Sequence, residues 1–164
     1  VDCDWSSDVC SSDLGHAVHG YDISAVRNSN LNAIGGHACA DAAQVPRQCD
    51  TVVLAVFNTE QVESLFEGPS HAPFEKRHLI ICTSTCDPDR IAALATRAAA
   101  RGIRFLECPL SGNSDQISKG NGIALAGGVR ADFEAAQPVL QALCKQSYFL
   151  GPAGSGGQIG RAHV

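Results

Sequence analysis

Short apolar stretches alternate with longer stretches of helical periodicity over most of this chain. Several of the apolar stretches, such as Thr51–Val56, contain almost no polar residue, which is typical of strands that are covered on both faces. Strands that alternate with helices in this way predict βαβ units around a mostly parallel sheet, and therefore an α/β fold. The predicted strands are Ala17–Tyr21, His37–Ala40, Thr51–Val56, Leu79–Thr83, Arg104–Glu107, Gly122–Ala126 and Ser147–Leu150.

The helices between these strands carry start and stop signals. Asp87 is a predicted N-cap with Pro88 in the first turn, and Gly102 ends that helix. Asn58, followed three residues later by Gln61, resembles a capping box that opens a second helix. Further helical stretches are expected at Ser24–Gly35 and at Asp132–Leu143, the latter kinked or restarted by Pro138.

Composition narrows the function classes. The chain has 164 residues, 45% of them hydrophobic and 18% charged, which fits one soluble globular domain. The formal net charge of −5 and the scattered basic residues argue against nucleic-acid binding. The longest apolar runs have the length of strands, so no membrane-spanning segment is expected and the predicted location is cytoplasmic.

The chain contains eight cysteines at irregular spacings. A disulfide framework is not expected because no signal peptide is visible, and single cysteines in apolar surroundings usually behave as small buried hydrophobes. A zinc site would need paired ligands at short spacings, and the sequence has no C-x-x-C pair. We therefore expect reduced thiols and no metal site.

The two ends of the chain do not share its hydrophobic periodicity. The codons ATC GGA AGA GCA CAC GTC encode residues 159–164, and their reverse complement encodes residues 8–13. That symmetry is what a sequencing adapter ligated to both ends of a DNA fragment would give. Our hypothesis is that residues 1–14 and 159–164 are translated adapter, and that residues 15–158 form an incomplete NAD(P)-binding domain.

Asp22 directly follows the predicted strand Ala17–Tyr21. In dinucleotide-binding folds an acid at the tip of the second strand accepts hydrogen bonds from the adenosine ribose. Taken alone, Asp22 is better explained as a solvated turn residue before Ser24. The glycine-rich turn that should precede it by about 20 residues is not in the sequence.

A more specific signal lies at Glu107-Cys108-Pro109-Leu110-Ser111-Gly112-Asn113, followed by Gly120. This segment resembles the substrate-binding signature of the β-hydroxyacid dehydrogenases, the family that includes 3-hydroxyisobutyrate, tartronate semialdehyde and L-threonate dehydrogenases and is related to 6-phosphogluconate dehydrogenase. The resemblance implies that Ser111, Gly112 and Asn113 form the substrate site, with Ser111 and Gly112 binding the substrate carboxylate. Asn113 stands where the family has a second glycine, which narrows that pocket.

The resemblance extends over residues 15–158. Val56-Phe57-Asn58 with Gln61 corresponds to the family's cofactor loop, and Ser84-Thr85-Cys86-Asp87-Pro88 to its Ser-Thr-x-x-Pro turn near the nicotinamide riboside. It implies a doubly wound, Rossmann-type sheet whose first strand is missing, with a gap or a non-native replacement beside Thr51–Val56. The implied cofactor is NAD, with NADP possible, held by the residues Asp22, Val56, Phe57, Asn58, Gln61 and Thr85.

The last match concerns catalysis. Gly151-Pro152-Ala153-Gly154-Ser155-Gly156 resembles the family's Gly-x-x-Gly-x-Gly, which leads into the helix of the catalytic lysine. By that count the lysine falls at Gly160, so the resemblance implies hydride transfer to or from a small β-hydroxyacid by the parent protein and an inactive fragment here. The parent is expected to be a homo-oligomer. The alternatives are a non-catalytic dinucleotide- or partner-binding module, or an unrelated α/β domain.

Overall fold

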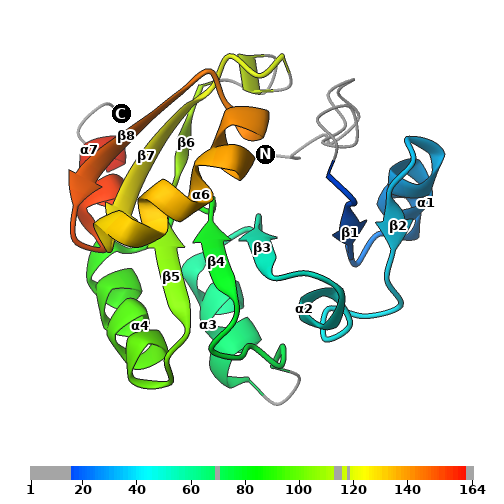
Figure 1. Cartoon of the computed structure of the whole chain (residues 1–164), viewed down its shortest axis with the longest axis horizontal. Coiled ribbons are helices and arrows are strands. Elements are labelled where there is room, and N and C mark those ends of the chain that lie inside the picture. Colours follow the sequence, from blue (N-terminus) through cyan, green and yellow to red (C-terminus); the bar gives the residue numbers. More distant parts are fainter. Residues whose placement is uncertain (1–15, 69–70, 113–115, 118, 162–164) are drawn as a thin grey trace.

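The computed structural model of the chain describes residues 16–68, 71–112, 116–117 and 119–161 (Figure 1). All seven predicted strands form. The sequence pattern did not predict the short helix α2 and the short strand β6, and the helix α7 was expected only from the family resemblance. In chain order the elements are β1 (His19–Gly20), α1 (Ala25–Ala33), β2 (His37–Ala38), α2 (Val45–Gln48), β3 (Thr51–Leu54), α3 (Thr59–Glu67), β4 (Leu79–Cys82), α4 (Pro88–Ala100), β5 (Arg104–Glu107), β6 (Leu110–Ser111), β7 (Ile123–Gly128), α6 (Arg130–Leu143), β8 (Gln146–Gly151) and α7 (Ser155–Arg161).

The main sheet has six strands. β3, β4 and β5 are parallel, with Val52 opposite Ile80 and Ile80 opposite Phe105. β7 runs the other way and pairs along one edge with both β5 and β6, while its other edge is parallel to β8. The register of β7 against β5 continues without a slip into β6, so the segment 104–111 follows one edge of β7. The prediction of a mostly parallel α/β sheet is confirmed.

β1 and β2 do not continue this sheet. They pair with each other in parallel, His19 opposite His37, and form a separate two-stranded sheet. In the described part of the chain β3 is an end strand of the six-stranded sheet, and Figure 1 shows β1, β2 and α1 beyond α2 from it. Among the described residues, no strand pairs with the outer edge of β3, which agrees with the gap expected beside Thr51–Val56.

Two hydrophobic clusters cover the two faces of the main sheet. Ile80, Cys82 and Phe105 pack with α3 and α4 on one face. Leu79, Ile81 and Leu106 alternate with them along the strands and pack with α6 on the other face. This alternation within each strand makes the sheet doubly wound, as predicted. None of the described helices is long and apolar enough to cross a bilayer.

The helix signals were mostly correct. The Asp87 side chain accepts hydrogen bonds from the backbone N–H groups of Asp89 and Arg90, and Gly102 follows the helix end with φ +75°. The prediction for α6 needs a correction, because that helix begins at Arg130 and runs through Pro138 without a restart. Pro138 deprives only the carbonyl of Glu134 of its helical partner, and Glu134 is exposed to water.

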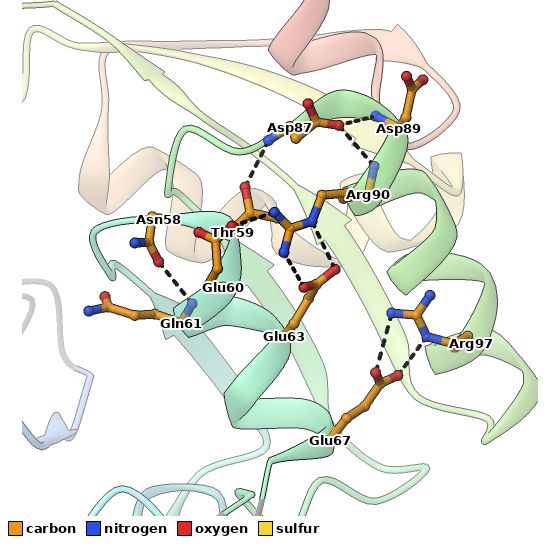
Figure 2. Close-up of polar contacts among 10 residues, drawn as sticks. All are labelled: Asn58, Thr59, Glu60, Gln61, Glu63, Glu67, Asp87, Asp89, Arg90 and Arg97. Atoms are coloured by element: carbon orange, nitrogen blue, oxygen red, sulfur yellow. Dashed lines mark hydrogen bonds and ion pairs between the residues drawn. The ribbon is translucent and has the colours of Figure 1, made fainter.

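Exposed ion pairs link α3 to α4 on the surface of the molecule (Figure 2). Arg90 bridges Glu60 and Glu63, with a distance of 2.6 Å between its Nη2 and the Oε2 of Glu63. Arg97 contacts Glu67 at 2.6 Å. Because solvent screens such pairs, they align two neighbouring helices more than they stabilise the fold.

Candidate functional site at the carboxyl ends of the strands

The loops that follow β3 and β4 are joined directly. The Ser84 hydroxyl donates to the carbonyl of Val56 at 2.7 Å and accepts from its N–H at 2.8 Å. Just before it, the N–H and the hydroxyl of Thr83 both donate to the carbonyl of Leu54, at 2.8 and 3.0 Å. The structure thus brings Val56 and the Ser84–Thr85 turn together at the carboxyl end of two neighbouring parallel strands.

The start of α3 fixes the shape of the first of these loops. Asn58 caps the helix by accepting from the N–H of Gln61 at 2.9 Å, as the capping box predicted. The side-chain oxygen of Gln61 in turn accepts from the N–H of Phe57 at 2.8 Å. Phe57 itself is 77% exposed. Asn58 and Gln61 therefore hold the loop in position, and the Phe57 ring is the part that faces solvent.

A second contact ties α3 to α4 at the same end of the sheet. The hydroxyl of Thr59, which is buried, accepts from the N–H of Asp87 at 2.9 Å (Figure 2). Thr85 lies between this contact and the bonds of Ser84, and its own side chain is exposed. The backbone around Thr85 is thus fixed on both sides while its side chain stays accessible.

Asp22 follows β1 and so belongs to the separate two-stranded sheet. Its carboxylate accepts from the N–H of Ser24 at 2.7 Å and pairs with Arg27 at 3.4 Å. Its backbone is held by Asn28, whose side-chain oxygen accepts from the N–H and whose amide donates to the carbonyl, both at 2.8 Å. Asp22 is therefore rigidly placed, but the β1–β2 ladder does not connect it to the loops after β3 and β4.

Ser111 and Gly112 lie past the end of β5, on the continuation of that strand along β7. The N–H of Cys108 donates to the carbonyl of Cys82, which places this continuation beside the end of β4. Both Ser111 and Gly112 are exposed, and Gly112 has φ +143°, a backbone conformation that favours glycine. Asn113, the third predicted substrate residue, lies outside the described residues.

Glu107 is a key residue that the sequence reasoning did not single out for a role of its own. Its side chain is 1% exposed, and its carboxylate accepts three backbone hydrogen bonds from the first turn of α7 and the residue before it. Oε2 accepts from Gly154 at 2.7 Å and from Gly156 at 3.2 Å, and Oε1 accepts from Gly157 at 2.9 Å. The end of β5 and the start of α7 are therefore joined through one carboxylate.

Burial and hydrogen bonding shift the pKa of Glu107 in opposite directions. Burial raises the pKa of Glu107, and the three N–H donors lower it only in part, so the net direction is upward. The N-terminal N–H groups of a helix have no helical partners and carry partial positive charge, which favours a carboxylate at that place. A glycine at position 127 leaves room for the Glu107 carboxylate, because a Cβ there would lie 2.7 Å from Oε2 of Glu107.

The sequence of this chain is similar to those of known NAD-binding proteins. The model of the NAD binding domain of 6-phosphogluconate dehydrogenase matches residues 10–151. The chain belongs to this family. The fold is thus that of an NAD-binding domain, and the expected nicotinamide cofactor agrees with it.

Relatives of this NAD-binding domain carry several names. L-threonate dehydrogenase of Cupriavidus necator is 29% identical over 88% of the chain and 50% of its own length. The cytokine-like nuclear factor N-PAC of Pongo abelii is 31% identical over 89% of the chain and 27% of its own length. Among solved structures, 3-hydroxyisobutyrate dehydrogenase of Salmonella typhimurium has a TM-score of 0.86 at 25% identity, covering 98% of this chain and 57% of that one. The chain spans half or less of the length of these two curated relatives.

Proposed function

We propose that this chain contributes the cofactor-binding part of an enzyme that transfers a hydride between NAD(P) and a small β-hydroxyacid, with 3-hydroxyisobutyrate as the type of substrate. The observation that carries the proposal is the joined pair of loops after β3 and β4, held by Ser84 and Val56. In open α/β sheets, ligands bind outside the carboxyl ends of the strands, which is where these loops meet.

The cofactor would contact side chains with distinct roles. Asp22 would accept hydrogen bonds from the adenosine ribose, because its half-buried carboxylate has acceptor positions beyond those used by Ser24 and Arg27. Arg27 is a cation beside the same position, which is why NADP stays an alternative to NAD. The exposed ring of Phe57 and the hydroxyl of Thr85 would face the bound cofactor, with Val56, Asn58 and Gln61 shaping the loop.

The substrate would sit beyond β5. Ser111 would donate its hydroxyl, and Gly112 its unobstructed N–H, to the substrate carboxylate, with Asn113 at the margin of that pocket. When bound, the nicotinamide ring would supply or accept the hydride. The catalytic lysine of the family would fall at Gly160, so we propose that this 164-residue chain does not turn over by itself. It should hold NAD weakly, because the sequence contains no glycine-rich turn for the pyrophosphate before Asp22.

A non-catalytic module is the second candidate. Relatives named as a nuclear factor are as similar to this chain as relatives named as dehydrogenases, at 31% and 29% identity. The residue that follows Gln158 in an uninterrupted gene would separate the two functions, since a lysine near position 160 supports the enzyme. Homo-oligomeric assembly and a cytoplasmic location belong to the same proposal.

The test of the cofactor site is an NMR titration of the chain with NAD, which detects weak binding residue by residue. We expect the amide signals of Phe57 and Thr85 to shift with NAD, and Thr85→Ala to weaken the effect. Thr96→Ala is the matched control, because Thr96 is an exposed threonine on α4 whose hydroxyl bonds the carbonyl of Ala92. Unchanged Phe57 and Thr85 signals at millimolar NAD would contradict the proposal.

A further inference from the structure

The segment that leads into β7 contains an asparagine followed by a glycine, Asn121-Gly122. Of the six asparagines in the chain, Asn121 is the only one that precedes a glycine. Asn121 is exposed to water, and both residues lie outside the helices and strands. Because glycine has no Cβ, its backbone nitrogen is less shielded from the preceding side chain than that of any other residue. Sequence and exposure thus bring together a side-chain amide and a backbone nitrogen that can react with each other.

The main chain is held on both sides of the Asn121–Gly122 peptide bond. Before it, the N–H of Asn121 donates to the carbonyl of Gln116 at 2.8 Å. After it, the carbonyl of Gly122 accepts from the N–H of Lys145 at 3.1 Å. The two groups that would react have no such bonds: within the described part of the chain, neither the side chain of Asn121 nor the N–H of Gly122 has a hydrogen-bond partner.

Asparagines elsewhere in the fold are placed differently. Asn28 precedes Ser29 within α1, and its side chain bonds both the N–H and the carbonyl of Asp22, each at 2.8 Å. Asn32 of the same helix accepts from the N–H of Ala38 at 2.8 Å. The backbone N–H that follows an asparagine inside a helix is itself bonded to the carbonyl four residues before it. These asparagines therefore lack the free side chain and free nitrogen that position 121 combines.

We propose that Asn121 is a deamidation site, at which water replaces the side-chain amide through a cyclic imide. The backbone nitrogen of Gly122 attacks Cγ of Asn121, the Cγ–Nδ2 bond breaks, and ammonia leaves with the proton that the backbone nitrogen gives up. Water then opens the imide. Opening at Cγ gives aspartate, and opening at the main-chain carbonyl carbon gives isoaspartate, in which the chain runs through Cβ and Cγ. Nothing is oxidised or reduced, and water is the only other reactant.

Either product changes the strand pair that carries Ser111. Ser111 is paired with Ile123 across β6 and β7, and a Cβ on Gly122 would lie 3.8 Å from the carbonyl oxygen of Ser111. Both products add a negative charge beside this pair, and isoaspartate also adds one carbon to the main chain directly before β7. The consequence for the substrate rests on the proposed function: the new carboxylate repels a substrate carboxylate at Ser111 and Gly112.

Mass spectrometry can assign the reaction to this residue, because trypsin isolates it. Cleavage after Lys119 and Arg130 gives residues 120–130, in which Asn121 has the only side-chain amide. After incubation of the folded chain in mildly alkaline buffer, we expect this peptide to carry OH in place of NH2 and an isoaspartyl methyltransferase to label part of it. The rate should lie within about tenfold of that of the synthetic peptide 120–130, since neither reacting group must first break a hydrogen bond.

Variants separate the roles of the two reacting groups. Asn121→Gln would have to close a larger ring and should keep its amide. Gly122→Ala should slow the reaction, because the added methyl group shields the nitrogen; its nearest neighbour would be Cγ1 of Ile117 at 3.3 Å, which a small shift relieves. The internal control is the tryptic peptide 28–47, which contains Asn28 and Asn32 and should keep its mass.

The effect on the substrate is measured separately by NMR titration with 3-hydroxyisobutyrate. The ligand should shift the amide signal of Ser111 in fresh chain, and its affinity should fall about twofold after deamidation, the effect of one like charge screened by water. Incubated Asn121→Gln chain should bind as fresh chain does. A fresh chain whose Ser111 signal does not respond would contradict the proposed substrate site, whereas the mass of peptide 120–130 decides the deamidation.

Two results would overturn the proposal. One is a peptide 120–130 that keeps its mass after the folded chain has been incubated for as long as the synthetic peptide needs to react fully. The other is the same gain of OH for NH2 at the same rate in the Asn121→Gln chain, which would show that ring closure onto Gly122 is not the route.

Discussion

Removing the Glu107 carboxylate tests whether it joins the end of β5 to the start of α7. Glu107→Ala would leave the N–H groups of Gly154, Gly156 and Gly157 without their acceptor in a buried place. Each hydrogen bond to a charged group contributes about 1.5–3 kcal/mol. The cost of burying the carboxylate is recovered in the variant, so the net loss of unfolding free energy should be about 3–5 kcal/mol.

Glu107→Gln keeps the size and shape of the side chain and changes only its charge and its hydrogen-bonding groups. The amide oxygen can replace the Oε2 atom that serves Gly154 and Gly156, but the amide nitrogen then faces the N–H of Gly157, so two donors meet. A buried donor without an acceptor costs about 1–3 kcal/mol. Glu107→Gln should therefore lie between the unaltered chain and Glu107→Ala in stability.

The assay is urea unfolding followed by circular dichroism, together with thermal melting. A loss of 3–5 kcal/mol lowers the melting temperature by about 10 °C in a chain of this size. Glu134→Ala, which removes an exposed glutamate from α6, is the matched control and should stay within about 0.5 kcal/mol of the unaltered chain. A Glu107→Ala variant within about 1 kcal/mol of the unaltered chain would refute the role given to Glu107.

The pH dependence gives an independent check with a definite sign. Burial raises the pKa of Glu107 above its ordinary value of 4.5, so the folded state binds this proton more tightly than the unfolded chain. Its contribution is fully present below the unfolded pKa and is lost as pH rises through the folded pKa. The stability difference between the unaltered chain and Glu107→Gln should thus widen as the pH falls from neutrality towards 4.5. A difference that narrows on acidification would show that the hydrogen bonds outweigh burial.

Three further predictions use other parts of the fold. Gly156→Ala should destabilise the chain by more than about 3 kcal/mol in urea unfolding, because its Cβ would lie 2.4 Å from the carbonyl oxygen of Leu125. Gly120→Ala, at φ +67° with open space around it, should cost only about 1 kcal/mol, and equal losses would contradict the steric argument. Asn58→Ala should lose the helix cap and about 1 kcal/mol, and an unchanged melting temperature would show that the cap contributes little. Asp22→Asn should raise binding of NADP relative to NAD about tenfold in paired titrations, and an unchanged ratio would remove Asp22 from the cofactor site.

Local signals in the sequence were enough to predict most of the elements. Helix caps such as Asp87 and Asn58 act within three residues, so their partners can be read from spacing alone. Buried strands such as β4 are apolar on both faces and carry their own signal. α2 was missed because four residues are too short for a helical period to develop. β6 was missed because Leu110–Ser111 directly follows Pro109 without an apolar run of its own and forms by pairing with β7.

The contacts that hold the candidate site together could not be predicted from local sequence patterns. The bonds of Ser84 to Val56 span 28 residues, and those of Glu107 to Gly154, Gly156 and Gly157 span 47 to 50 residues. Neither partner of such a pair has a local pattern that points to the other. The available signal was indirect, an acid at the end of an apolar strand, since a buried carboxylate requires donors from elsewhere in the fold.

Glu107 also links two parts of the proposed function. It stands four residues before Ser111, which we propose binds the substrate carboxylate, and its side chain holds the first turn of α7. Residue 160, where we propose that the family's lysine falls, lies about one helical turn beyond Gly156 and Gly157. A shift of the Glu107 carboxylate would therefore displace the substrate strand and the helix relative to each other. A loss of Asp22 would leave both in place, because Asp22 belongs to a separate sheet.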